Sequence, residues 1–81
     1  MTRDLIIPVS VQEAMAELER AQQAYEPMSS AHEGYAILKE EVDELWDEIK
    51  KKPHARSNEA MRKEAIQVAA MALRFVEDVT P

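Results

Sequence analysis

Acidic residues recur at helical spacing in one stretch of the sequence, LKEEVDELWDEI, which covers residues 38–49 and contains six carboxylates. Glu41 and Glu44 are three residues apart, so on a helix their Cβ atoms lie roughly 5 to 6 Å apart and both carboxylates can reach one cation. On a helical wheel they share one shoulder of the apolar stripe with Glu48, whereas the other acids of the stretch point away from it. Taken alone, this segment fits a solvated acidic face as well as a cation site.

Glu64 is an acidic residue at an apolar position. On the wheel of the last helical segment it falls inside an arc formed by Met61, Val68, Met71 and Phe75. An ionised carboxylate in apolar surroundings is destabilising unless a cation or hydrogen bonds compensate for the lost hydration. Two partners would do so: a basic side chain from another helix, or a metal ion shared with the acids of the earlier stretch.

A shared metal site requires the two helical segments to pack antiparallel, which the short connection between them favours. Glu41, Glu44 and Glu64 would then converge at about mid-length of both helices. Carboxylates with no His or Cys nearby select a hard cation. We therefore expect Mg²⁺, with Mn²⁺ as the alternative, rather than Zn²⁺.

Proline residues divide the chain into three segments of helical character. The sequence has one Gly and four Pro, and the apolar residues between the prolines recur at three- and four-residue steps without strand-like alternation. We expect helices at about 10–26, 31–52 and 58–79, in a single domain that spans residues 1–81. The expected helix starts are Ser10 and Ser30, each with a Glu three residues later as in a capping box, and Ser57 or Asn58.

The size of the chain limits the core that it can bury. A chain of 81 residues buries roughly 60% of its unfolded surface, and this one is 46% hydrophobic but only 5% aromatic. It has no cysteine, which excludes disulfides and thiolate zinc sites. The sequence predicts an all-α fold, a small antiparallel bundle of about three helices that is completed by oligomerisation, as a homodimer or homotetramer.

Charge and hydropathy exclude several classes of partner. The net charge of −6 opposes nucleic-acid binding, which depends on Lys and Arg neutralising phosphates. The N-terminal apolar run is too short for a signal peptide, and no segment approaches the ~20 apolar residues of a membrane helix. We expect a soluble, cytoplasmic protein that binds neither nucleic acid nor membrane.

The acidic pattern resembles that of the MazG-type nucleoside triphosphate pyrophosphohydrolases, an all-α family with E-E-x-x-E on one helix and E-x-x-D on the next. The first half is complete here as EEVDE at residues 40–44, and the second half is EAIQ at residues 64–67, with Gln in place of the final Asp. The resemblance covers roughly residues 32–79. It implies Mg²⁺-dependent hydrolysis of a (d)NTP between the α- and β-phosphates, giving a monophosphate and diphosphate, in dimers or tetramers built by helix packing.

The resemblance also implies roles for individual residues. Glu41, Glu44 and Glu64 would be metal ligands, and Gln67 occupies a further ligand position. Glu40 and Glu41 form the expected catalytic set, in which Glu40 is the candidate base or outer-shell acceptor for the attacking water.

Two of these positions allow another interpretation. The amide oxygen of Gln67 can bind Mg²⁺, but the substitution removes one negative charge, and the side chain could equally hydrogen-bond a neighbouring helix. Arg74 lies on the same side of its helix as Gln67, where it would meet a substrate phosphate or form a surface or interface ion pair. Tyr35 and Trp46 occupy apolar-stripe positions, where core or subunit contact is expected.

Two functions follow from the sequence. The first is a metal-dependent nucleotide pyrophosphohydrolase acting on a nucleoside triphosphate. The alternative is a non-catalytic MazG-like module that binds nucleotide, or a helical interaction module whose acids serve as a solvated surface.

Overall fold

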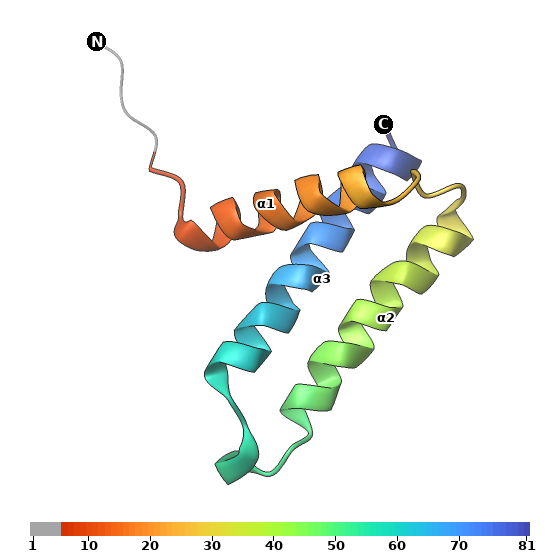
Figure 1. The fold of residues 1–81 in the computed structure, drawn as a ribbon. Helices are drawn as coiled ribbons and strands as arrows, with labels where there is room; N and C mark the ends of the chain where they lie inside the picture. Colours follow the sequence, from red (N-terminus) through yellow and green to blue (C-terminus); the bar gives the residue numbers. More distant parts are fainter. Residues whose placement is uncertain (1–5) are drawn as a thin grey trace.

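The structure, a computed structural model, describes residues 6–81 and is built from three α-helices (Figure 1). These are α1 (Val9–Ala24), α2 (Ala31–Ile49) and α3 (Asn58–Val79), with one 3₁₀ turn, η1 (Pro53–Ala55), between α2 and α3. The described residues contain no strand, which confirms the predicted all-α class.

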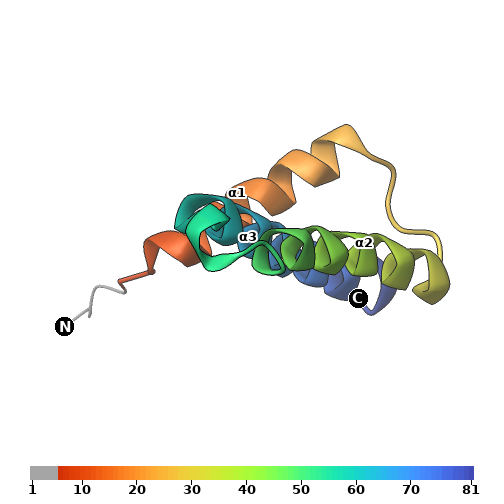
Figure 2. The ribbon, with the colours of Figure 1, turned by 90° about the horizontal axis from the view of Figure 1, so that it is seen from below.

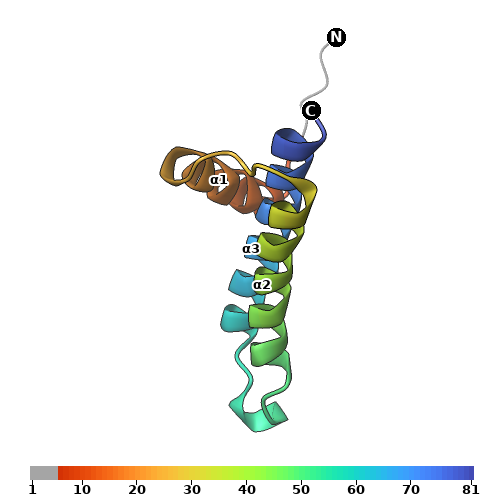
Figure 3. The same cartoon turned by 90° about the vertical axis from the view of Figure 1, so that its right-hand side faces the viewer.

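Helix α3 is the centre of the fold because it packs against both other helices, whereas the backbones of α1 and α2 do not come close to each other within the described residues. Figure 1 shows α2 running antiparallel to α3, and Figure 3 shows α1 on one side of this pair. The molecule measures only 19 Å along its shortest principal axis, about two helix diameters, and Figure 2 shows this thin profile. A cavity in this region is lined by residues of all three helices, among them Ala21, Glu41 and Met71.

The helix starts follow local side-chain chemistry at two of three positions. The Ser30 hydroxyl accepts a hydrogen bond from the Glu33 backbone N–H at 3.0 Å, and the Ser57 hydroxyl accepts one from Ala60 N–H at 3.1 Å. Each bond satisfies one of the backbone donors that the first helical turn leaves unpaired. The predicted caps of α2 and α3 are confirmed, with Ser57 rather than its neighbour as the cap.

The predicted cap of α1 is wrong. Pro8, not Ser10, precedes the first helical residue, and no side chain caps this end. The Pro8 carbonyl accepts hydrogen bonds from the N–H groups of Val11 and Gln12 at 3.0 and 3.1 Å. Ser10 therefore lies inside the first turn, because the backbone bonds to Pro8 start the helix before it.

Two helices end earlier than the periodicity predicts. Helix α1 ends two residues before the expected residue 26 and α2 three residues before the expected residue 52. Tyr25 is extended, with φ −131° and ψ 152°, and Lys52 has φ −59° and ψ 148°. Lys52 directly precedes Pro53, and steric conflict with a proline ring keeps the preceding residue out of the helical region. Tyr25 lies two residues before Pro27, so the same conflict acts on the next residue, Glu26.

The core is small and rich in alanine. The buried hydrophobic residues are Ala14, Ala21, Met28, Ala70 and Met71, and no large side chain is completely buried. Small residues at the α1–α3 crossing allow the two backbones to approach closely, so few methylene groups are removed from water there. The structure includes no helix among its described residues with the length and apolarity needed to cross a membrane.

Much of the predicted apolar stripe of α2 is exposed in the single chain. Val42 is 45% exposed, Trp46 57% and Tyr35 62%. The three residues lie near one face of α2 by helical spacing, and α3 alone does not cover them. The core of one chain thus leaves an apolar face for which the sequence predicted core or subunit contact.

Gly34 fixes the closest approach of α2 to its neighbours. A Cβ atom at this position would lie 2.6 Å from Cδ2 and 2.8 Å from Cε2 of Phe75, and 3.1 Å from the sulfur of Met28. Real Cβ atoms do not approach ring carbons so closely. A residue larger than Gly therefore forces the Phe75 ring, and with it the contact between α2 and α3, to shift.

We expect Gly34→Ala to destabilise the protein by about 1 kcal/mol, measured by urea unfolding. Overpacking against the ring costs ~1–3 kcal/mol, and a gain of up to ~1 kcal/mol in helix propensity offsets part of it. Ala36→Gly at an exposed position of the same helix measures the propensity difference alone. If Gly34→Ala stabilised the protein by the amount that Ala36→Gly loses, the close contact with Phe75 would be contradicted.

Candidate metal centre

Three carboxylates converge between α2 and α3. Antiparallel packing brings Glu41 and Glu44 of α2 opposite Glu64 of α3, and one oxygen from each lies within 4.8 Å of the others. Among the described residues this is the group of acids close enough to share a cation. The convergence expected from the helical spacing is present, and three carboxylate oxygens at this separation can hold a metal ion in common.

The carboxylates of this cluster disfavour their own ionisation. Burial, followed by the negative charges of Glu44 and Glu64, raises the pKa of Glu41 from 4.5 to about 7. Burial and then the charge of Glu44 also raise the pKa of Glu64. Glu64 is half-buried rather than enclosed, so the apolar arc predicted around it is open on one side. A bound cation would offset the mutual repulsion and favour the charged forms.

Stability should therefore fall with rising pH when no metal is present. A carboxyl whose pKa is higher in the folded than in the unfolded state stabilises the fold fully at a pH below its unfolded-state pKa. This stabilisation is lost as the pH rises from the unfolded-state pKa to the folded-state pKa. For Glu41 the window runs from about pH 4.5 to about pH 7. We expect a loss of about 1–2 kcal/mol across it, after allowing for solvent screening of a half-buried group.

Urea unfolding in the presence of a chelator, at pH 4.5 to 8, measures this loss. Glu41→Gln is the matched control, because the parent minus the variant isolates this carboxyl from other titrating groups. Millimolar Mg²⁺ should remove the fall in the parent. Identical pH profiles for parent and variant would contradict the repulsive cluster.

Glu40 is exposed, but it lines the same cavity of about 480 Å³ as Glu41, and its charge adds to the rise in the pKa of Glu41. The wheel places this residue away from the apolar shoulder, yet the cavity that it shares with Glu41 extends to Tyr25 at the end of α1. Its carboxylate can contact solvent beside the cluster, as a base or an outer-shell acceptor must.

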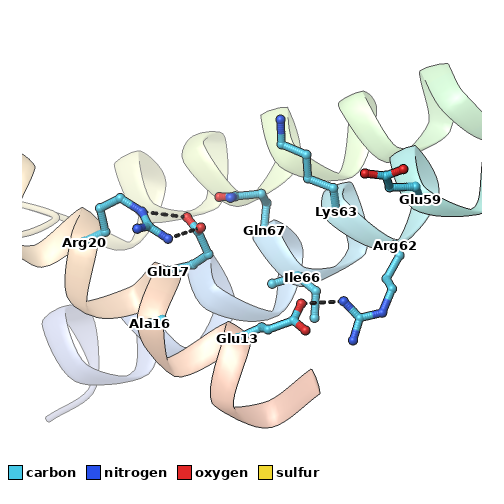
Figure 4. A pocket seen from close by; sticks show the side chains of 9 residues that line it. All are labelled: Glu13, Ala16, Glu17, Arg20, Glu59, Arg62, Lys63, Ile66 and Gln67. Atoms are coloured by element: carbon cyan, nitrogen blue, oxygen red, sulfur yellow. Dashed lines mark hydrogen bonds and ion pairs between the residues drawn. The ribbon is translucent and has the colours of Figure 1, made fainter. Parts of the chain in front are cut away.

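Gln67 faces α1 and is half-buried. The pKa of Glu17 is lowered first by its hydrogen bond from Arg20 and then by one from Gln67. Figure 4 shows Gln67 beside the Glu17–Arg20 pair. The amide also lines a cavity of about 260 Å³ together with Glu41, so Gln67 lies between the cluster and α1.

Helix α1 brings polar residues to the site that sequence reasoning missed. Glu17 and Arg20 lie three residues apart and pair with each other, which is ordinary for an exposed helix surface. Their spacing gives no sign of a site. Only the crossing of α1 over α3 brings them beside Gln67 and Glu41.

Arg74 is the one buried charged residue in the described part of the chain, with 4% of its surface exposed. Its guanidinium donates a hydrogen bond to the Glu26 carbonyl at 2.8 Å and lies 3.5 Å from a carboxylate oxygen of Asp78. It also lies over the ring of Tyr25, 5.7 Å from its centroid. The residue lines the cavity that contains Glu41. Its contacts to Glu26 and Tyr25 join the α1–α2 connection to α3, and its ion pair with Asp78 is buried within α3 rather than lying at the surface or at an interface.

No protein-family model matches the chain, and searches of curated proteins and of solved structures return no match either.

Proposed function

We propose that this protein is a Mg²⁺-dependent nucleoside triphosphate pyrophosphohydrolase, which converts a (d)NTP and water to a (d)NMP and diphosphate. The observation that carries the proposal is the convergence of Glu41, Glu44 and Glu64 within 4.8 Å of one another. The resemblance of EEVDE and EAIQ to the MazG-type motif supports the same function from the sequence.

The residues around the cluster suit this reaction. Bound to Glu41, Glu44 and Glu64, with Gln67 adjacent, Mg²⁺ would supply charge neutralisation for the polyphosphate. Glu40 is exposed beside Glu41 and is the candidate to orient the attacking water and accept its proton. Water attacks the α-phosphorus, the bond from that phosphorus to the bridging oxygen breaks, and diphosphate leaves with the bridging oxygen.

The test is diphosphate release from a panel of canonical and modified (d)NTPs with Mg²⁺ or Mn²⁺. Glu41→Gln is the blank, since it keeps the size of the side chain and removes one ligand charge. Release that depends on metal and disappears in the blank supports the enzyme. Absence of release across the panel, from protein whose melting temperature does rise with Mg²⁺, would instead favour a nucleotide-binding module without catalysis.

The exposed face of α2 favours a second feature of the proposal, association into a homodimer or homotetramer. Val42, Trp46 and Tyr35 lie on this face and are 45–62% exposed. Burying such side chains removes apolar area from water, and a chain of this size gains from it. The alternative function, a helical interaction module, would use the same face without needing the carboxylate cluster.

Trp46→Glu separates these uses of the face. Sedimentation equilibrium should show an oligomer for the parent and a monomer for this variant, with Asp43→Asn on the exposed side of α2 as the control. A monomeric parent would contradict the association.

A further inference from the structure

Three cavities beside α3 share lining residues with one another, and we call this series of cavities the trough. The first, of about 340 Å³, lies between α1 and α3 and is drawn in Figure 4. The second shares Glu17, Arg20 and Gln67 with the first. The third, of about 480 Å³, shares Tyr25, Glu41 and Met71 with the second. Glu41 of the carboxylate cluster therefore lies between the two ends of the trough.

The end of the trough around Tyr25 has an aromatic and carboxylate lining. Tyr25 is 67% exposed, and the buried Arg74 guanidinium lies over its ring, 5.7 Å from the centroid, in a contact that favours this orientation of the ring. The cavity is also lined by Ile37 and by carboxylates, which accept hydrogen bonds but do not donate them: Glu26, Glu33 and Glu40. An exposed, fixed ring beside acceptors suits a planar ligand that carries amino groups.

The opposite end of the trough is lined by three cations from two helices, Arg20, Arg62 and Lys63, and by the carboxylates of Glu13, Glu17 and Glu59. Arg62 pairs with Glu13 and Arg20 pairs with Glu17 (Figure 4), and such exposed pairs contribute little to stability, so an anion can compete for them. Lys63 forms no ion pair within 4 Å among residues 6–81. Figure 4 shows its side chain pointing away from the pair formed by Arg62.

A nucleoside triphosphate has a planar base at one end, an anionic tail at the other and the scissile bond between them, which matches the order of Tyr25, Glu41 and Lys63 along the trough. We propose that the substrate lies along the trough with its base on Tyr25 and its β- and γ-phosphates at Arg20 and Lys63. This inference rests on the proposed function, to which it adds a direction of binding. It also assigns a substrate class, nucleotides whose base carries an exocyclic amine, such as cytosine.

Base preference follows from the acceptors beside the ring. The amine of cytosine donates a hydrogen bond to a carboxylate. The carbonyl oxygen at the same position of uracil is an acceptor, as the carboxylate is, so the two repel each other. A cytidine nucleotide should therefore bind about tenfold more tightly than the uridine nucleotide.

Equilibrium binding to the full chain tests the direction without requiring turnover. The probes are inorganic diphosphate, CMP, and the α,β-methylene analogues of CTP and UTP, each titrated calorimetrically with Mg²⁺. Tyr25→Leu removes the ring and Tyr25→Phe keeps it. Lys63→Gln removes the cation and Lys63→Arg keeps it. Lys39→Gln controls for net charge, because Lys39 is exposed on α2 and pairs with Asp43.

Tyr25→Leu should weaken the binding of CMP about tenfold and leave the binding of diphosphate unchanged, because stacking involves only the base. Lys63→Gln should weaken the binding of diphosphate about tenfold and leave the binding of CMP unchanged, because a charge-assisted contact to the β- and γ-phosphates is lost. The two conservative variants and Lys39→Gln should bind like the parent. The crossed pattern, unchanged binding in both variants, or equal affinity for the CTP and UTP analogues would overturn the proposal.

Together with the assay of diphosphate release, this experiment distinguishes failure of the proposed direction of binding from failure of the proposed hydrolase. Analogue binding with the expected variant pattern, but no diphosphate release from CTP, would contradict the hydrolase and support the direction of binding. Metal-dependent release together with variants that bind like the parent would support the hydrolase and contradict the direction. Absence of analogue binding and of release would contradict both.

Discussion

Glu64→Gln is expected to make the metal-free protein more stable and to abolish its stabilisation by Mg²⁺. In the parent, burial and the charge of Glu44 disfavour the ionised Glu64 carboxyl and raise its pKa. A neutral amide of the same size removes this repulsion, so we expect a gain of about 1 kcal/mol without metal near neutral pH. The variant also replaces one of the three negatively charged carboxylates that would bind the metal with a neutral amide.

The metal response is the larger effect. A ligand that binds only the native state at 100 times its dissociation constant adds ~2.7 kcal/mol to the free energy of unfolding. The parent should show a gain of this order in saturating Mg²⁺, whereas Glu64→Gln should show almost none. Thermal melts with a chelator and with increasing Mg²⁺ measure both effects, and diphosphate release should fall about a hundredfold or more in the variant.

Asp43→Asn is the matched control for this prediction. Asp43 lies on α2 close in sequence to the cluster, but its side chain is 60% exposed and pairs with Lys39. Asp43→Asn should therefore be stabilised by Mg²⁺ as much as the parent is. A Glu64→Gln variant that is destabilised equally with and without Mg²⁺ would instead indicate that Glu64 pairs with a basic side chain, since removal of one partner exposes the cost of the other.

The carboxylate cluster could be predicted because it follows from short-range geometry. The three-residue step between Glu41 and Glu44 fixes their relative position on any helix, and a short connection favours antiparallel packing against the helix that carries Glu64. The caps at Ser30 and Ser57 are equally local. These features depend on helical periodicity and on backbone groups within one turn, both of which the sequence contains.

The surroundings of the cluster could not be predicted, because they depend on where α1 crosses α3. Glu17 and Arg20 form an ordinary pair on the wheel of α1, and nothing in their spacing places them beside Gln67. The wheel of α3 likewise gives no indication that Arg74 is buried. Its burial arises from the extended backbone at Tyr25, which brings the ring and the following carbonyl of Glu26 onto the guanidinium.

Helical periodicity also predicted too complete a core. Val42 and Trp46 belong to the apolar stripe of α2, yet 45% and 57% of their surfaces are exposed in one chain. A wheel identifies which side of a helix is apolar, but not how much of that side a single neighbour can cover. Helix α3 covers part of the stripe, and the backbone of α1 does not come close to α2, which leaves the remainder for the proposed association.

Arg74→Met is expected to cause the largest loss of stability in the chain, about 3 kcal/mol by urea unfolding. The side chain is almost fully buried and ends in contacts to the Glu26 carbonyl, the Asp78 carboxylate and the Tyr25 ring. Removing one member of a buried ion pair costs ~3–5 kcal/mol, because the remaining charge stays desolvated. Asp78 keeps a hydrogen bond from the Met28 backbone N–H at 3.0 Å, which moderates this loss.

Arg56→Met is the control, since Arg56 also donates to a backbone carbonyl, that of Ile49 at 2.7 Å, but is exposed. It should cost less than ~1 kcal/mol. Hydrogen exchange should also increase at residues 25–30 in Arg74→Met, because the guanidinium joins this connection to α3. If Arg74→Met were no more destabilising than Arg56→Met, its buried contacts would not hold the α1–α2 connection, and the fixed orientation of the Tyr25 ring would lose its support.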